Sequence, residues 1–337
     1  VNLSLRPGTP MDFEWDKIRE MIVQNRLAHS DTVFAYDLAW EPFLGRQRER
    51  MRWDPRWRQW IQRHYVTVEG AEQAWGFAAP RNKEGQVTNP LDAHCGADGA
   101  WGKMVADYRR FIDEVVDEHY TRARELVRSA DPHHLVSFRM TVAGDPTFNQ
   151  AHNMPYDFRG LVRGVDLFEP EGYGRIGDWQ RVRPGMFTVA YARAIDPSKP
   201  VMWAEYGVSS WDMNLMQASP SGLNFQGRFY EDFLQMVLHS GANGAVCWWY
   251  PGGFRTNERS DYGILNPDGT DRPATVVLRK YAEQVTRPRD IPQPQVWIEF
   301  NADHPAGMEG IYKQVSSPFW QTVESGQVPG LRPRGKK

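Results

Sequence analysis

The chain has 337 residues, of which 41% are hydrophobic, so it can bury a large core as one α/β barrel or as two ordinary domains. Its 40 Lys and Arg residues nearly balance its 42 Asp and Glu residues, and the net charge of -2 gives no strong field for nucleic acid or an anionic membrane. No apolar run reaches the roughly 18 residues of a membrane span. A polar, neutral ligand fits this composition best.

The predicted elements begin with the strand–helix–strand pattern of a parallel sheet. Residues 1–5 and 32–39 are the two predicted strands, and a helical pattern lies between them. Residues 43–99 then break the rhythm with an Arg- and Trp-rich stretch and a run rich in Gly, Pro and Asn. Irregular segments of this length inside a compact domain commonly line binding sites, so we expect an excursion that lines a cleft.

The alternation of strands and helices resumes after this excursion. A long amphipathic helix ends near Asp131 and Pro132. Further strands are predicted at residues 134–138, 165–168, 201–204 and 245–249, and helices at residues 187–195, 225–238 and 274–285. A Pro-rich link precedes one more strand candidate at residues 296–300. The sequence therefore predicts an α/β domain over residues 1–285 and a C-terminal extension over residues 286–337.

Two of the predicted strands end in a glutamate. Ala-Tyr-Asp-Leu-Ala-Trp-Glu-Pro ends in Glu41 and Pro42, and Lys-Pro-Val-Met-Trp-Ala-Glu-Tyr-Gly carries Glu205. The strands of a parallel barrel end on one rim, so residues far apart in sequence can meet there. One carboxylic acid and one carboxylate at such a rim are what cleavage of a glycosidic bond requires. The alternative is that each glutamate belongs to a structural ion pair.

These motifs, together with a Trp-rich strand followed by an Asp-Tyr-Gly loop, resemble the retaining glycoside hydrolases of the 4/7 superfamily (clan A type). That superfamily is built on the TIM (β/α)8 barrel, and the residues leave the family within it unassigned. The resemblance implies that Glu41, at the end of strand four, is the acid/base and that Glu205, at the end of strand seven, is the nucleophile. The chain would then carry strands 3 to 8, with the excursion at residues 43–99 after strand 4.

A barrel with only these strands would be open. Two strand edges and an apolar interior would be unprotected. We therefore expect that a missing N-terminal segment, a second chain, or the segment after residue 290 completes the barrel.

Further side chains near the predicted strand ends are candidates for binding the substrate: Trp40, Arg139, Glu169, Glu171, Tyr173, Tyr206, Trp248 and Trp249. The superfamily often has a tyrosine after strand six that hydrogen-bonds the nucleophile, and Tyr173 fits that place, the alternative being a loop aromatic. Arg139 would contact the substrate or a carboxylate, unless it is a surface arginine. Glu169 and Glu171 would bind sugar hydroxyls or be solvated.

Two tryptophan positions carry specific expectations. Successive strand residues face opposite ways, so one of Trp248 and Trp249 should form a stacking platform and the other should pack under a helix. Trp40 stands where the superfamily usually has an asparagine whose amide binds a sugar hydroxyl, so that contact must come from elsewhere.

No metal and no cofactor are expected. His133 and His134 are adjacent and cannot both face one site on a strand, and Cys247 lies in an apolar run that is typical of a buried strand. No phosphate-binding glycine loop follows a strand, and Gly-x-Ser-x-Gly is absent.

The sequence thus predicts a retaining glycosidase that cleaves β-glycosidic bonds of an oligo- or polysaccharide by double displacement. There are two alternatives: a non-catalytic carbohydrate-binding or scaffold barrel, and a subunit completed by a partner chain. The tryptophan at position 40, in place of the usual asparagine, favours the first of them. The sequence does not determine which sugar or linkage is cleaved. It does not determine the compartment either, although a secreted or periplasmic location is favoured.

Overall fold

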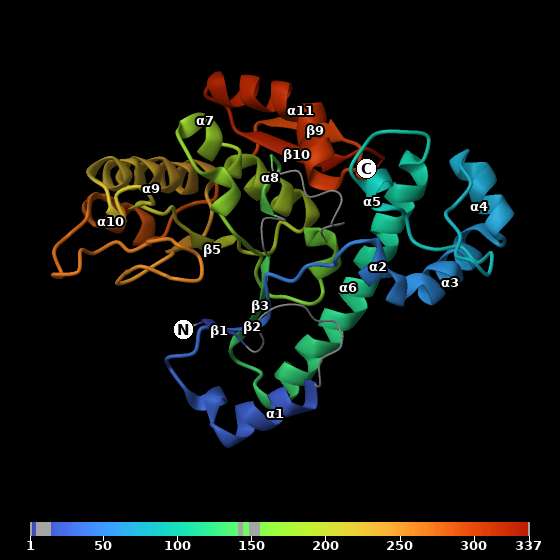
Figure 1. Cartoon of the computed structure of the whole chain (residues 1–337), viewed down its shortest axis with the longest axis horizontal. Coiled ribbons are helices and arrows are strands. Elements are labelled where there is room, and N and C mark those ends of the chain that lie inside the picture. The colour runs from blue at the N-terminus through green and yellow to red at the C-terminus, as the bar shows by residue number, and fades with distance from the viewer. Residues whose placement is uncertain (1, 5–14, 141–143, 148–155, 336–337) are drawn as a thin grey trace.

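The structure is a computed structural model, shown in Figure 1, that describes residues 2–4, 15–140, 144–147 and 156–335. Within these residues, six strands run parallel in chain order. They are β1 (Asn2–Ser4), β2 (Ala35–Trp40), β3 (Leu135–Met140), β4 (Glu169–Pro170), β5 (Met202–Tyr206) and β8 (Gly244–Cys247). Two isolated bridges, Phe168 to Val201 and Glu171 to Glu205, join β4 to β5. The prediction of an α/β domain with a parallel sheet is confirmed.

Helices connect the strands, as the alternating pattern predicts. Those that follow the sheet order are α1 (Trp15–Gln24), α6 (Gly102–Ala130), α7 (Trp179–Val182), α8 (Gly185–Ile195), α9 (Pro220–Ser240) and α10 (Pro273–Thr286). Short 3-10 turns lie at η1 (Leu27–His29), η2 (Met51–Trp53), η5 (Phe158–Leu161) and η6 (Tyr173–Arg175). No helix among the described residues is both long enough and apolar enough to cross a bilayer.

The predicted boundaries hold for most elements, and the exception is β4. Its ladder comprises Glu169–Pro170, whereas the sequence predicts residues 165–168. Asp166 explains the difference, because its N–H donates to the Val136 carbonyl while its carboxylate accepts from the Val136 N–H and from Arg124. The segment before β4 is therefore held by side chains as well as by a ladder. Val1 and Leu5, the two ends of the first predicted strand, lie outside the described residues.

Helix α6 buries one face against the sheet and ends where its sequence predicts. Asp131 closes it, since its carboxylate accepts hydrogen bonds from the backbone N–H groups of His133 and His134. The same carboxylate accepts a 2.7 Å hydrogen bond from the hydroxyl of Tyr36 in β2. These bonds hold the pKa of Asp131 well below its usual range, although burial opposes them. The turn after α6 is thereby tied to the strand that leads to Glu41.

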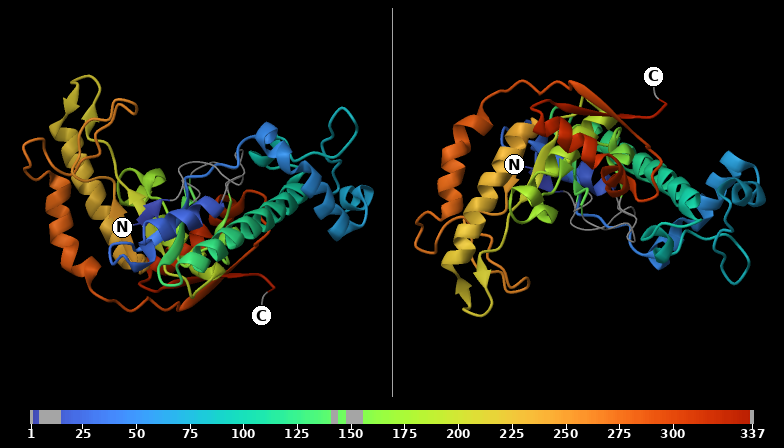
Figure 2. Two further views of the ribbon diagram at one scale, coloured as in Figure 1. Left: turned by 90° about the horizontal axis from the view of Figure 1, so that it is seen from below. Right: turned by 90° about the horizontal axis from the view of Figure 1, so that it is seen from above.

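The excursion at residues 43–99 is helical rather than irregular, which corrects the prediction of a loop. It contains α2 (Gln47–Arg50), α3 (Asp54–Tyr65), α4 (Val68–Trp75) and α5 (Asp92–Cys95). The fully buried Trp57 lies within 6 Å of the rings of Trp60, Trp75, Tyr108 and Phe111, the last two from α6. The excursion thus packs on the N-terminal half of α6, at the side of the molecule opposite α9 and α10 (Figure 2).

The C-terminal segment forms a small layer of its own. β9 (Val296–Phe300) pairs with β10 (Pro329–Pro333) in parallel, and α11 (Gly307–Glu324) connects them. Phe300 and Phe319 pack on the α8 residues Tyr191 and Phe187, with ring centroids 5.6 and 5.3 Å apart. In the described residues β9 and β10 pair with each other alone, so the expectation that the segment after residue 290 could complete the sheet is wrong.

Replacing Trp57 with alanine should destabilise the protein by about 3–5 kcal/mol, because the cavity left among four aromatic rings cannot close. The same replacement at Trp297, which is 53% exposed, should change the free energy of unfolding by less than about 1 kcal/mol. Chemical denaturation measures both. Equal losses at the two positions would show that the aromatic cluster of the excursion does not stabilise the fold.

Candidate functional site

Glu41 lies immediately after β2, at a place where the strand is irregular. The register between β2 and β3 shifts between Asp37 and Trp40, which marks a bulge, and Glu41 has a φ of 48°. Its backbone N–H still donates to the carbonyl of Arg139, 3.1 Å away. Bulges re-aim side chains at the ends of strands, and a left-handed φ in a non-glycine residue is uncommon. The chain therefore turns Glu41 out of the regular alternation of β2.

Glu205 lies within β5, beside a second register shift. The ladder between β5 and β8 is irregular between Trp203 and Tyr206, and the Glu205 side chain is almost completely buried. Its carboxylate accepts a hydrogen bond from the hydroxyl of Tyr173 at 2.7 Å and a charge-assisted one from Arg139. Burial, followed by the nearby Glu205, raises the pKa of Tyr173 far above its usual value, so the hydroxyl stays a donor.

The structure brings three carboxyl groups together. One oxygen from each of Glu41, Glu171 and Glu205 lies within 4.8 Å of the others. Burial raises the pKa of Glu41, and the charge of Glu205 adds to this effect, whereas a hydrogen bond with Glu171 opposes it. Glu171 is completely buried, and burial together with the charges of Glu41 and Glu205 raises its pKa well above the usual value.

Arg139 is the cation of this site, and Asp37 is bonded to it. The Arg139 Nε and Nη2 atoms donate to Asp37 at 3.1 and 2.8 Å, and the third guanidinium nitrogen donates to Glu205. Asp37 has no exposed surface, and its burial raises its pKa in spite of the arginine. Asp37 was missed by the sequence analysis. The signal was present, since Asp37 is a lone acid inside an otherwise apolar strand.

The aromatic side chains lie partly as predicted. Trp40 is half-buried, and the guanidinium carbon of Arg139 lies 4.9 Å from its ring centroid. The rings of Trp248 and Trp249 stack on each other, 5.3 Å apart and 16° from parallel. The prediction that these two rings face opposite sides is wrong, because β8 ends at Cys247 and strand alternation does not extend to them. Arg255 lies over both rings.

Two predicted substrate-binding residues are buried. Tyr206 is 1% exposed, and its ring stacks on Phe233 of α9 at 4.1 Å. The prediction for Tyr206 is corrected, because adjacent residues of β5 alternate, so a strand that delivers Glu205 to the site turns Tyr206 toward the helix layer. Glu169, like Glu171, has no exposed surface, so its role in binding stays a prediction.

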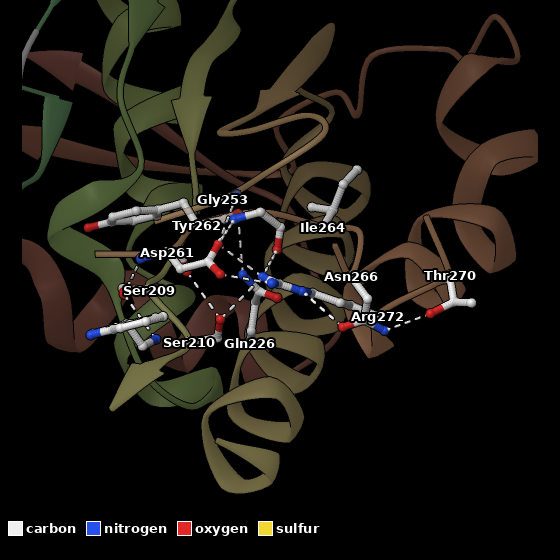
Figure 3. A network of polar contacts seen from close by, with 12 residues as sticks. Ser209, Ser210, Gln226, Gly253, Asp261, Tyr262, Ile264, Asn266, Thr270 and Arg272 are labelled. Atoms are coloured by element: carbon white, nitrogen blue, oxygen red, sulfur yellow. Dashed lines mark hydrogen bonds and ion pairs between the residues drawn. The ribbon is translucent and has the colours of Figure 1, made fainter. Parts of the chain in front are cut away.

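The loop after β8 contains a network of polar contacts, which Figure 3 shows. Asp261 and Arg272 are almost fully buried and form a bidentate ion pair, with both nitrogen–oxygen distances at or below 3.0 Å. The backbone carbonyl of Asp261 accepts from the N–H of Ser210, which follows β5. Tyr262, the next residue, lies edge-on to Tyr173 at 6.1 Å. This network positions the aromatic neighbour of the tyrosine that donates to Glu205.

The three glutamates could also ligate a cation. Carboxylate oxygens are the ligands that Mg²⁺, Ca²⁺ and Mn²⁺ prefer, and the three groups are close enough to share one ion. The Arg139 guanidinium, however, already neutralises Glu205. An acidic cluster with a bound guanidinium is sufficient for acid–base chemistry without a metal.

The sequence matches a known family over residues 18–287, a range that includes Glu41, Glu171 and Glu205. This family is glycoside hydrolase 42, described as beta-galactosidase. The chain belongs to this family. The match narrows the superfamily resemblance, which left the family unassigned. No curated protein matches the chain.

Solved structures of beta-galactosidases share the fold. The enzyme from Rahnella sp. R3 superimposes with a TM-score of 0.65 at 17% identity, over 97% of this chain and 49% of that one. The enzyme from Bacillus circulans sp. alkalophilus gives 0.65 at 13% identity, over 96% and 48%. That from the haloarchaeon Halorubrum lacusprofundi gives 0.64 at 16% identity, over 95% and 49%. The chain thus spans about half the length of these structures.

Replacing Arg272 with alanine leaves the buried carboxylate of Asp261 without its cation and should cost about 3–5 kcal/mol of unfolding free energy. The matched control is Arg287→Ala, because its ion pair with Glu283 is largely exposed and should contribute less than about 1 kcal/mol. Denaturation at neutral pH measures both variants.

The pH dependence provides a second check on this pair. The Arg272 hydrogen bonds lower the pKa of Asp261, although burial opposes them. The pair therefore stabilises the fold fully above about pH 3.8, the pKa of Asp261 in the unfolded chain. This stabilisation is lost as the pH falls through the lower pKa that Asp261 has in the folded protein. Arg272→Ala should therefore flatten the loss of stability in acid. An unchanged acid profile would contradict this role of the pair.

Proposed function

We propose that this protein is a retaining β-glycosidase, with β-galactosides as the substrate class, that works by double displacement with Glu41 as acid/base and Glu205 as nucleophile. One observation carries the proposal: carboxyl groups from the ends of two separate strands lie within 4.8 Å of each other in opposite electrostatic settings. Glu41 is held toward its protonated form by burial, whereas Glu205 accepts hydrogen bonds from Arg139 and Tyr173. The family description supports the substrate class.

The proposed reaction has two steps. In the first, Glu205 attacks the anomeric carbon, the glycosidic bond breaks, and Glu41 gives its proton to the departing oxygen. In the second, Glu41 takes a proton from water, the water oxygen attacks the anomeric carbon, and the ester bond to Glu205 breaks. Two inversions retain the configuration. Inverting enzymes keep their carboxyl groups roughly 6.5–9.5 Å apart to fit a water molecule, so the close pair favours retention.

We further propose that the six parallel strands correspond to strands 3 to 8 of a (β/α)8 barrel whose other strands come from another segment or a partner chain. The half coverage of the solved structures supports this, and so does β8, where Val246 is 51% exposed although barrel strands are normally covered. In this proposal residues 1–285 form the barrel part. The excursion at residues 43–99 and the loop at 207–222 would border the cleft of the complete barrel.

Replacing Glu205 with glutamine should abolish hydrolysis of an aryl β-galactoside, since an amide cannot form the glycosyl ester. Glu41→Gln should lower kcat by about 10²–10⁴-fold for a poor leaving group and by much less for a good one that departs without a proton. Glu299→Gln, at an exposed residue far from the site, is the control. NMR of the first product should show retained anomeric configuration.

A different pattern would favour the carbohydrate-binding alternative that Trp40 suggests. Sugar binding by calorimetry without turnover in any assembly of the chain would contradict the enzyme proposal, and an inverted product would contradict the role of Glu205.

The pH profile should reflect the raised pKa of Glu41. A general acid works only while protonated, so kcat/KM should fall as pH rises through the pKa of Glu41, at a pH above the ordinary value of 4.5. Measuring kcat/KM against pH with a poor leaving group checks this. A decline that begins below pH 4.5 would mean that burial does not protect the proton of Glu41.

A further inference from the structure

Glu171 is a third carboxyl group that the double-displacement scheme does not use. It follows β4, and a bridge pairs its backbone with that of Glu205 in β5. Its side chain has no exposed surface, and no donor among the described residues reaches either of its oxygens. An ionised carboxylate that is buried without a donor is very costly, so a protonated Glu171 is the form that this environment tolerates.

The neighbours of Glu171 indicate where its proton points. One carboxyl oxygen of Glu41 and one of Glu171 lie within 4.8 Å of each other, and two carboxyl groups so close can hydrogen-bond only if a proton lies between them. The remaining groups that act on Glu171 are Glu205 from β5, the Arg139 guanidinium from β3, and the hydroxyls of Tyr173 and Tyr156. Arg139 uses its nitrogens on Asp37 and Glu205.

The charge balance of the site leads to the same conclusion. Asp37, Glu41, Glu171 and Glu205 are four acids, and Arg139 is the cation that contacts them in the described residues. The guanidinium is bonded to Asp37 and Glu205, so no cation among the described residues bonds to Glu41 or Glu171. Like charges this close cannot both be ionised in a buried site, and the pair must keep at least one proton.

We propose that Glu171 is a positioning residue that works as a neutral carboxylic acid and donates a hydrogen bond to the Glu41 carboxyl. This inference rests on the proposed function, because it gives Glu171 a task in the same reaction. The hydrogen bond holds the ionised Glu41 in place between the two displacement steps, where it takes a proton from the attacking water. The neutral state of Glu171 also keeps a further negative charge away from Glu205. The direction of the pKa shift of Glu171 agrees with this task.

Two substitutions at Glu171 distinguish a role as hydrogen-bond donor to Glu41 from a role in packing alone. Glu171→Gln keeps a neutral donor of the same shape, and Glu171→Met keeps the volume without a donor. With an aryl β-galactoside as probe, Glu171→Gln should retain kcat within about threefold, whereas Glu171→Met should lose about 10²-fold in kcat with little change in KM. Equal activity of the two variants, whether high or low, would overturn the proposal.

The proton itself can be observed without turnover. At pH 7 the infrared difference between wild type and Glu171→Gln should contain the carbonyl band of a protonated carboxyl group. Glu258→Gln is the matched control, because Glu258 acts on Glu41 through its charge alone and is partly exposed, and that variant should keep the band. Absence of the band from wild type would overturn the proposal, even if Glu171→Met does not fold.

The two readouts also distinguish this inference from the proposed function. A wild-type protein that shows the band but hydrolyses no β-galactoside would refute the function and leave the protonation of Glu171 standing. A wild-type protein that turns over substrate and lacks the band would refute the role of Glu171 and leave the function standing.

Discussion

The site depends on one electrostatic constraint: within the described part of the chain, four acidic side chains share a buried space with one guanidinium, that of Arg139. Arg139 bonds to Asp37 on one side and to Glu205 on the other, so each of these two carboxyl groups has a cation in contact with it. Glu41 and Glu171 lie beyond its hydrogen-bonding reach, and burial shifts both toward the protonated form. One cation thus divides chemically identical carboxyl groups into two kinds, and an acid and a nucleophile in one site require that division.

The surrounding structure keeps these groups in place through buried ion pairs and hydrogen bonds behind the strands. Asp131 ties the end of α6 to Tyr36 in β2, so the strand that leads to Glu41 is fixed to the longest helix. Asp261 and Arg272 hold the loop behind Tyr173 in the same way. Removing one partner from such a pair leaves an uncompensated charge, which makes these contacts sensitive points of the fold.

Much of this could be predicted from local patterns. Alternating strand and helix signals predict the parallel sheet, because each βα unit is encoded within a short stretch of chain. Glu41 and Glu205 stand out because each ends an apolar run. No sequence motif marks Asp37 as a site residue. Its role depends on its hydrogen bonds with Arg139, which is about a hundred residues away in the chain. The burial of Glu171 likewise depends on contacts between strands that no local pattern contains.

The misplaced residues have similar causes. Trp248 and Trp249 were assigned to opposite faces by strand alternation, but the strand ends before them. The excursion at residues 43–99 has the Gly, Pro and Asn content of a loop in one part only, and its tryptophans are spaced to pack on α6. Tyr206 was judged by its neighbour Glu205, although adjacent strand residues face opposite layers.

The central claim is that Glu205 is the carboxylate that bonds to the sugar. A β-galactoside with fluorine at C2 and a good leaving group slows the second displacement and lets the glycosyl ester accumulate. Mass spectrometry of the digested protein then locates the added sugar. The account predicts one labelled peptide with the sugar on Glu205, and a label on Glu41 or Glu171, or turnover with no label at all, would contradict it.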